Sequence, residues 1–126
     1  MDEAGRKRVL VVDDDIDVLK GLMRVIQDYA HVKVALGAEA ALEHMDKVKQ
    51  DEGASYDVVI VDFNMIGQNG AWLLERVRER YPDCERILVS GSSQFDLNTF
   101  LSPGLVHRFL EKPVEFDELI EVVSED

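Results

Sequence analysis

Residues 8–15, RVLVVDDD, contain the pattern that indicates the fold class most clearly. A run of valine and leucine without polar alternation ends here in three consecutive aspartates. Such a run is typical of a strand that is buried on both faces, as in the centre of a parallel sheet covered by helices. Because the aspartates follow the run directly, the sequence predicts carboxylates at the carboxyl end of a central strand.

Similar apolar runs recur along the chain and are separated by helical patterns. We expect central strands over residues 8–12, 56–61 and 86–89, and half-exposed edge strands over 31–36 and 106–110. Apolar residues three and four positions apart predict helices over 19–29, 38–48, 73–81 and 116–123, with a weaker pattern at 95–101. Residues 47–55 are polar and are predicted to form a surface connection. This alternation favours an α/β fold around a parallel sheet.

The connections between parallel strands restrict the order of the sheet. If every crossover is right-handed, the five strands form a doubly wound parallel sheet in the order 2-1-3-4-5. Strands 1 and 3 then lie side by side, and the connections that follow them leave in opposite directions. Ligands of such sheets bind at this switch point, at the carboxyl ends of the strands. The residues that follow strands 1 and 3 are therefore the first candidates for function.

Length and composition limit the classes of function. A chain of 126 residues, 46% of them apolar, predicts a single domain over residues 1–126 with no output domain. The 26 acidic and 14 basic residues give a net charge of −12, which argues against direct binding to nucleic acid or to an anionic membrane. One cysteine cannot form an internal disulfide, and the apolar run 9–12 is too short for a signal peptide or a membrane span. We expect a soluble cytoplasmic protein.

Polar or charged residues follow four of the five predicted strands. They are Asp13, Asp14 and Asp15 after the first strand, Asp62 after the third, Ser90 after the fourth, and Lys112 with Pro113 after the fifth. A helix N-terminus, where carboxylates cap free amides, accounts for Asp15 or Asp17 but not for Asp62 on the neighbouring strand. Two carboxylates about 5 Å apart repel by roughly 3 kcal/mol at an effective dielectric near 20. Three carboxylates placed at this distance must protonate or hold a cation.

The residue types at these strand ends suit phosphoryl transfer assisted by a divalent cation. Oxygen ligands around a compact site favour Mg²⁺ or Mn²⁺, and the sequence has no cysteine and histidine cluster that would favour zinc. Asp62 would be the nucleophile that forms an acyl phosphate, and Ser90 would hydrogen-bond a phosphoryl oxygen. Lys112 would neutralise an incoming phosphoryl group, although taken alone it is better explained as a solvated lysine before a turn proline.

Four blocks of sequence, in this order, resemble the receiver domain of two-component response regulators. They are VLVVDDD at 9–15, VVIVDFNM at 58–65 with Gly70 eight residues after Asp62, ILVSGSS at 87–93, and FLEKP at 109–113. The resemblance covers essentially the whole chain and implies a flavodoxin-like (βα)5 fold. It implies a phosphoprotein that catalyses only its own phosphorylation and dephosphorylation, and is otherwise not an enzyme. Phosphorylation would switch the surface formed by the fourth helix, the fifth strand and the fifth helix.

The resemblance also implies which residues hold the cation. Asp62 is similar to the phosphoacceptor, and Asp14 to the direct ligand of Mg²⁺. Asp13 would act partly through water, and Asn64 would contribute its backbone carbonyl. Ile66 departs from the family pattern, which has proline at this position, so the loop after Asp62 loses a fixed φ and is expected to be more mobile.

The remaining matching positions concern the phosphoryl group and the switch. Ser90 is similar to the switch hydroxyl and Lys112 to the lysine that contacts the phosphoryl group. The peptide bond between Lys112 and Pro113 would be cis. Phe109 lies three residues before Lys112, at the position of the switch aromatic, although an aromatic on an edge strand is otherwise explained by packing.

The leading hypothesis is a receiver that takes a phosphoryl group from a histidine kinase or a histidine phosphotransfer protein and acts on a downstream protein or output domain. A phosphatase of the haloacid dehalogenase class is an alternative, but residues 13–17 lack the threonine of its D-x-D-x-T pattern. A flavin-binding electron carrier would require a Ser/Thr/Gly phosphate loop where this chain is acidic. An interaction module that is never phosphorylated is the third alternative.

Overall fold

The computed structural model describes residues 5–92, 94–99 and 101–124. Its strands are β1 (Arg8–Asp13), β2 (His31–Leu36), β3 (Val58–Asp62), β4 (Glu85–Ser90) and β5 (Arg108–Glu111). Its helices are α1 (Ile16–Ile26), α2 (Ala38–Glu52), α3 (Gly70–Arg80), α4 (Gln94–Leu97) and α5 (Phe116–Val123). Strands and helices alternate along the chain, as the sequence predicts.

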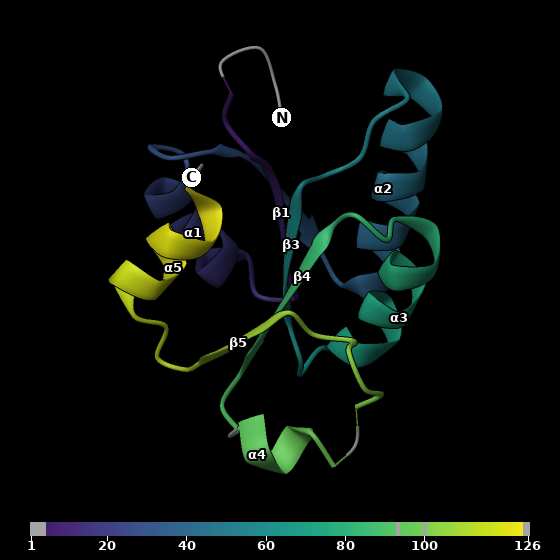
Figure 1. Cartoon of the computed structure of the whole chain (residues 1–126). Helices are drawn as coiled ribbons and strands as arrows, with labels where there is room; N and C mark the ends of the chain where they lie inside the picture. The colour runs from purple at the N-terminus through teal and green to yellow at the C-terminus, as the bar shows by residue number, and fades with distance from the viewer. Residues whose placement is uncertain (1–4, 93, 100, 125–126) are drawn as a thin grey trace.

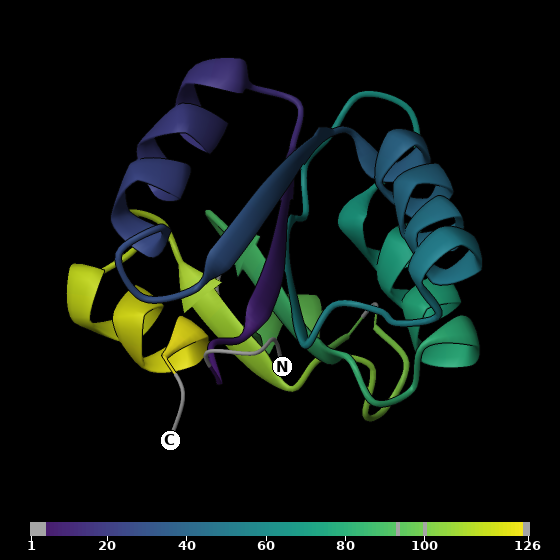
Figure 2. The same cartoon turned by 90° about the horizontal axis from the view of Figure 1, so that it is seen from above.

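The strands form one parallel sheet in the order β2-β1-β3-β4-β5, which confirms the predicted doubly wound α/β fold. β1 and β3 are neighbours, with Val12 opposite Val61 near their carboxyl ends. Helices α1 and α5 cover one face of the sheet, and α2 and α3 cover the other (Figures 1 and 2). Because both faces are covered, the central strands are buried along almost their whole length.

Each face of the sheet has its own apolar core, because successive side chains of a strand point to opposite faces. Leu10, Val12 and Val59 contribute to the core beneath α2 and α3. Val9 and Val11 contribute to the core beneath α1 and α5. The near-continuous apolar runs of the sequence therefore supply both cores at once and leave the polar residues for the strand ends.

The largest errors in the predicted boundaries concern α2 and α4. Residues 47–55 do not form a connection throughout, because α2 continues to Glu52. Lysine, glutamine and glutamate are good helix formers even where they are exposed. The helix ends at Gly53, whose φ of 71° lies in the left-handed region and whose N–H donates to the carbonyl of Lys49. The weaker helix predicted at 95–101 is also wrong in extent, because α4 comprises only Gln94–Leu97. Residue 100 lies outside the described part of the chain.

Smaller shifts affect other elements. β3 and β5 begin at Val58 and Arg108, each two residues later than predicted. α1 ends at Ile26, so Tyr29 lies beyond it. These shifts leave the carboxyl ends of the strands, where the candidate residues lie, close to their predicted positions.

The connection between α4 and β5 is anchored to the start of β4 by a buried arginine. Arg86 is 5% exposed and donates from Nε to the carbonyl of Leu105 at 2.7 Å and from Nη2 to that of Gly104 at 3.3 Å. The backbone N–H of Arg86 donates to Nδ1 of His107 at 2.8 Å. Burial, and next the charge of Arg86, lower the pKa of His107, which favours the neutral ring that this hydrogen bond requires.

We expect Arg86→Met to lower the free energy of unfolding by about 1–3 kcal/mol, because the carbonyl of the buried Leu105 loses its donor. Urea denaturation followed by circular dichroism measures this change. The matched control is Arg24→Met on the exposed face of α1, for which we expect a change below about 0.5 kcal/mol. Equal effects of the two substitutions would contradict the anchoring role of Arg86.

Candidate functional site

The site begins with two aspartates that end neighbouring strands. Asp13 is the last residue of β1 and Asp62 the last residue of β3, and each is 5% exposed. The backbone just after Asp62 is held by the N–H of Phe63, which donates to the carbonyl of Val89 on β4 at 2.9 Å. Because β1 and β3 pair in parallel, both carboxylates lie on the same rim of the sheet.

Asp14 joins these residues in a cluster of three carboxylates. One oxygen of each of Asp13, Asp14 and Asp62 lies within 4.8 Å of the others. Asp14 is exposed, whereas its two neighbours are buried. Burial raises the pKa of Asp13, and the nearby charge of Asp62 raises it further. Crowded, partly buried carboxylates with hard oxygen donors are the chemistry that a Mg²⁺-sized cation requires, so the residues present fit such an ion.

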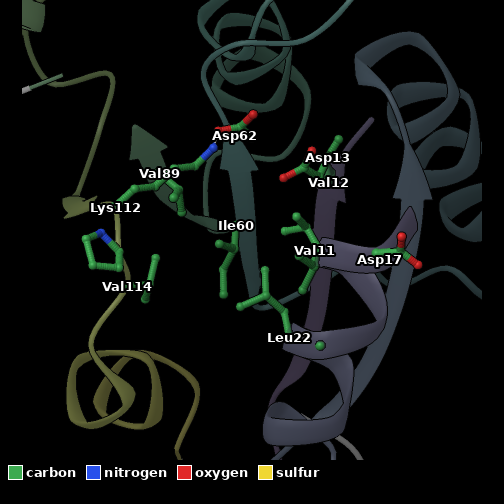
Figure 3. Close-up of a pocket in the computed structure, with 13 residues that line it drawn as sticks. Val11, Val12, Asp13, Asp17, Leu22, Ile60, Asp62, Val89, Lys112 and Val114 are labelled. Carbon is green, nitrogen blue, oxygen red and sulfur yellow. Dashed lines mark ion pairs between the residues drawn. The ribbon is translucent and has the colours of Figure 1, made fainter. Parts of the chain in front are cut away.

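Lys112 provides a positive charge at the edge of the cluster. Its Nζ lies 2.8 Å from Oδ1 of Asp62, and no other donor in the described residues bonds this buried oxygen. Figure 3 shows Lys112 reaching Asp62 while Asp13 faces both from the neighbouring strand. The hydrogen bond to Asp62 is the largest cause of the raised pKa of Lys112. The peptide bond that follows, to Pro113, is cis.

Ser90 lies on the same rim, at the end of β4. Its side chain is 2% exposed, and its Oγ accepts a hydrogen bond from the N–H of Ser92 at 3.0 Å. Its backbone carbonyl accepts from the N–H of Lys112 at 2.9 Å. The ends of β4 and β5 are therefore joined beside the acid cluster. Asn64 is exposed in the loop between β3 and α3.

Phe109 is not part of the acid cluster. It is half-buried on β5 and packs against the core beneath α2 and α3. It also lines a cavity of about 180 Å³ together with Leu101 and Val106. The structure therefore places the aromatic ring beside the α4–β5 connection, where space is available for it.

Asp15 has a different role from Asp13 and Asp14. It is the N-cap of α1, and its Oδ1 accepts from the N–H groups of Asp17 at 2.9 Å and Val18 at 3.3 Å. The helix-start explanation is confirmed for this residue. The N–H of Asp15 also donates to Oδ1 of Asp13 at 3.1 Å, which orients that carboxylate.

One contact at the site is not predicted by any sequence pattern. The backbone N–H of Ile66 donates to Oδ2 of Asp14 at 2.8 Å, between residues 52 positions apart. This bond joins the β3–α3 loop to the β1–α1 loop. Local patterns contain no signal for it, because the bond depends on the tertiary approach of two loops and uses a backbone group. The proline of the family pattern could not donate it.

Gly70 packs directly against the backbone of Asp62. A Cβ at this position would lie 2.7 Å from the carbonyl oxygen of Asp62 and 3.0 Å from the Cα of Phe63. The N–H of Gly70 donates to the carbonyl of Phe63 at 3.0 Å. Only a residue without a side chain allows α3 to begin this close to the end of β3.

A cavity of about 390 Å³ opens beside the acids, between α1 and the β5–α5 connection (Figure 3). Asp13, Asp62 and Lys112 line it on one side. The remaining wall is mostly apolar and includes Val11, Val18, Leu22, Ile60, Val89 and Val114. The carboxylates can therefore be approached from this side of the molecule.

Comparison with known protein families identifies the family to which this chain belongs. Residues 9–124 match the family described as the response regulator receiver domain. The chain belongs to this family. The protein is thus homologous to receiver domains that are phosphorylated in two-component regulators and kinases. Receiver domains bind Mg²⁺ at an acidic pocket, and the cluster of Asp13, Asp14 and Asp62 is the acidic group at this rim.

Individual relatives agree with the family. The receiver is 31% identical over 118 residues to the hydrogenase transcriptional regulatory protein HoxA of Bradyrhizobium diazoefficiens, covering 93% of this chain and 23% of that protein. It is 32% identical over 126 residues to the sensor kinase CckA of Brucella abortus, covering 98% of this chain and 13% of that one. The chain therefore spans less than a quarter of the length of these two relatives.

A solved structure of a response regulator is also similar to this chain. The response regulator TrrA from Thermotoga maritima, in complex with Mg²⁺ and BeF, is similar with a TM-score of 0.77 and 29% identity, covering 91% of this chain and 94% of that one. No helix in the described part of the receiver is both long and apolar enough to cross a membrane.

We expect Gly70→Ala to destabilise the receiver by about 1–3 kcal/mol and to displace Asp62, because the added Cβ would clash with the backbone of Asp62 and Phe63. Gly21→Ala is the matched control. Gly21 lies within α1 and a Cβ there meets nothing within 4 Å, so this substitution should stabilise the protein by roughly 0.5–1 kcal/mol. Thermal unfolding distinguishes the two. A Gly70→Ala protein as stable as the wild type would contradict the close approach.

Proposed function

We propose that this receiver accepts a phosphoryl group on Asp62, in a reaction that depends on Mg²⁺ or Mn²⁺. The observation that carries the proposal is the convergence of Asp13, Asp14, Asp62 and Lys112 on one rim of the sheet. The donor would be a phosphohistidine of a histidine kinase or a histidine phosphotransfer protein. Membership of the receiver family supports this donor class.

Asp62 is suited to act as the nucleophile. Its backbone is fixed by β3 and by Gly70, and its side chain is turned toward Lys112. One carboxylate oxygen forms the new bond to phosphorus, while the bond from phosphorus to the donor imidazole breaks and the imidazole nitrogen keeps the electron pair. The product is an acyl phosphate on Asp62. The reaction requires little more of the protein than positioning and charge.

The residues around Asp62 divide the remaining tasks. Asp13 and Asp14 would hold the cation together with Asp62 and the backbone carbonyl of Asn64. When bound, the cation supplies positive charge that offsets the charge of the carboxylates and the phosphoryl oxygens. Lys112 would contact a phosphoryl oxygen with its ammonium group, which already lies 2.8 Å from Asp62.

Ser90 and Phe109 would convert phosphorylation into a change of surface. Ser90 is buried at the rim, where its hydroxyl can turn from Ser92 toward a phosphoryl oxygen. Phe109 would then move into the space behind Ser90. Because Phe109 packs beside the α4–β5 connection, its movement would alter the surface formed by α4, β5 and α5.

The same reasoning defines the partners. Residues 1–126 would act as one receiver domain in the cytoplasm, with its output in a downstream protein or an output domain. The net charge of −12 supports a protein partner over direct contact with nucleic acid or an anionic membrane.

The receiver would catalyse only its own phosphorylation and dephosphorylation. A phosphatase of the haloacid dehalogenase class would need Asp15 as an acid–base group, whereas its carboxylate caps α1.

We expect Asp62→Asn to abolish incorporation of radioactive phosphate from labelled acetyl phosphate in the presence of Mg²⁺, because an amide oxygen is too weak a nucleophile. Removal of the cation with EDTA should abolish labelling of the wild type. Asp28→Asn, an exposed acid after α1, is the control and should label as the wild type does. Undiminished labelling of the Asp62→Asn protein would contradict the assignment of the phosphoacceptor.

A further inference from the structure

Among the described residues, a backbone hydrogen bond joins the two loops that carry the proposed cation ligands. Asp13 and Asp14 lie in or next to the β1–α1 loop, and Asn64 lies in the β3–α3 loop. The N–H of Ile66 donates to Oδ2 of Asp14 at 2.8 Å and so connects the loops across the site. The contact is a charge-assisted hydrogen bond, the stronger class of such bonds.

Asp14 depends on this bond more than the other two acids depend on any one contact. Asp13 and Asp62 are buried at the ends of strands, and their backbones are held by the sheet. Asp14 is exposed and lies beyond the last residue of β1. In the described part of the chain, the hydrogen bond from Ile66 is the contact that orients its carboxylate.

The β3–α3 loop is held at both of its ends by backbone hydrogen bonds. Phe63 is bonded to the carbonyl of Val89 at one end, and Gly70 is bonded to the carbonyl of Phe63 at the other. Ile66 lies between these points, two residues after Asn64. Its hydrogen bond to Asp14 therefore restrains the segment that presents the Asn64 carbonyl.

The side chain of Ile66 does not take part in the contact with Asp14. It is 90% exposed, so it contributes almost nothing to packing. The part of the residue that contacts the site is its N–H, which every residue except proline provides. A positioning role of residue 66 can therefore be separated by substitution from any role of its side chain.

We propose that the backbone N–H of Ile66 is a positioning group for the cation site. It holds Oδ2 of Asp14, leaves Oδ1 of Asp14 as the candidate ligand, and keeps the Asn64 segment beside the acids. Hydrogen bonds that orient ligating carboxylates typically change metal affinity by about 10–100-fold. This inference rests on the proposed function, because it assumes a cation held by Asp13, Asp14 and Asp62.

The test is the dissociation constant of Mg²⁺, measured by calorimetric titration of MgCl₂ at constant ionic strength. We expect Ile66→Pro, which lacks the N–H, to weaken binding by about tenfold or more. Ile66→Ala keeps the N–H and should bind within about twofold of the wild type, because the side chain that it shortens is exposed. Weakened binding in the Ile66→Ala protein, or unchanged binding in the Ile66→Pro protein, would overturn the proposal.

A second variant separates the lost N–H from the rigidity of proline. Replacing the peptide bond between Met65 and Ile66 by an ester removes the N–H and retains the isoleucine side chain. The ester protein should lose Mg²⁺ affinity as Ile66→Pro does, with unchanged circular dichroism. An ester protein that binds like the wild type would assign the proline effect to its ring and overturn the proposal. Absence of Mg²⁺ binding by the wild type would instead overturn the proposed cation site itself.

Discussion

Repulsion among three carboxylates is the constraint on which the site depends. Oxygens of Asp13, Asp14 and Asp62 lie within 4.8 Å of one another, and each pair of full charges at such a distance costs roughly 3 kcal/mol at an effective dielectric near 20. Lys112 offsets only part of this charge through its contact with Asp62. Burial is the main cause of the raised pKa of Asp13, and the charge of Asp62 adds to it. A cation held by the three carboxylates would offset the remaining repulsion.

The fold imposes this crowding through the order of its strands. In the order β2-β1-β3-β4-β5, β1 and β3 are adjacent, so residues that follow distant segments of the chain meet at one rim. Local features then set the geometry of that rim. Asp15 caps the N-terminus of α1, Gly70 lets α3 begin against the backbone of Asp62, and the N–H of Ile66 joins the two loops. The anchoring of the α4–β5 connection by Arg86 takes place near the start of β4, away from this rim.

Much of this could be predicted from the sequence, because the relevant signals are local. An apolar run followed by aspartates identifies a central strand and its carboxyl end, and right-handed crossovers supply the strand order. Helix boundaries were less predictable where propensity and polarity conflict. The polar segment after residue 47 remains helical up to Gly53, and the segment after Leu97 leaves the helix although it contains apolar residues. The hydrogen bond between Ile66 and Asp14 had no signal, because it uses the backbone and joins two distant loops.

The most direct test of the central claim is a crystal structure of the receiver grown with Mg²⁺ and fluoroberyllate, a mimic of the phosphoryl group. We expect beryllium bonded to a carboxylate oxygen of Asp62, with Lys112 and Ser90 at its fluorines. We also expect Mg²⁺ at about 2.1 Å from its protein oxygens, between Asp14, Asp62 and the Asn64 carbonyl. Fluoroberyllate on another residue, or a cation bound away from the three acids, would contradict this expectation.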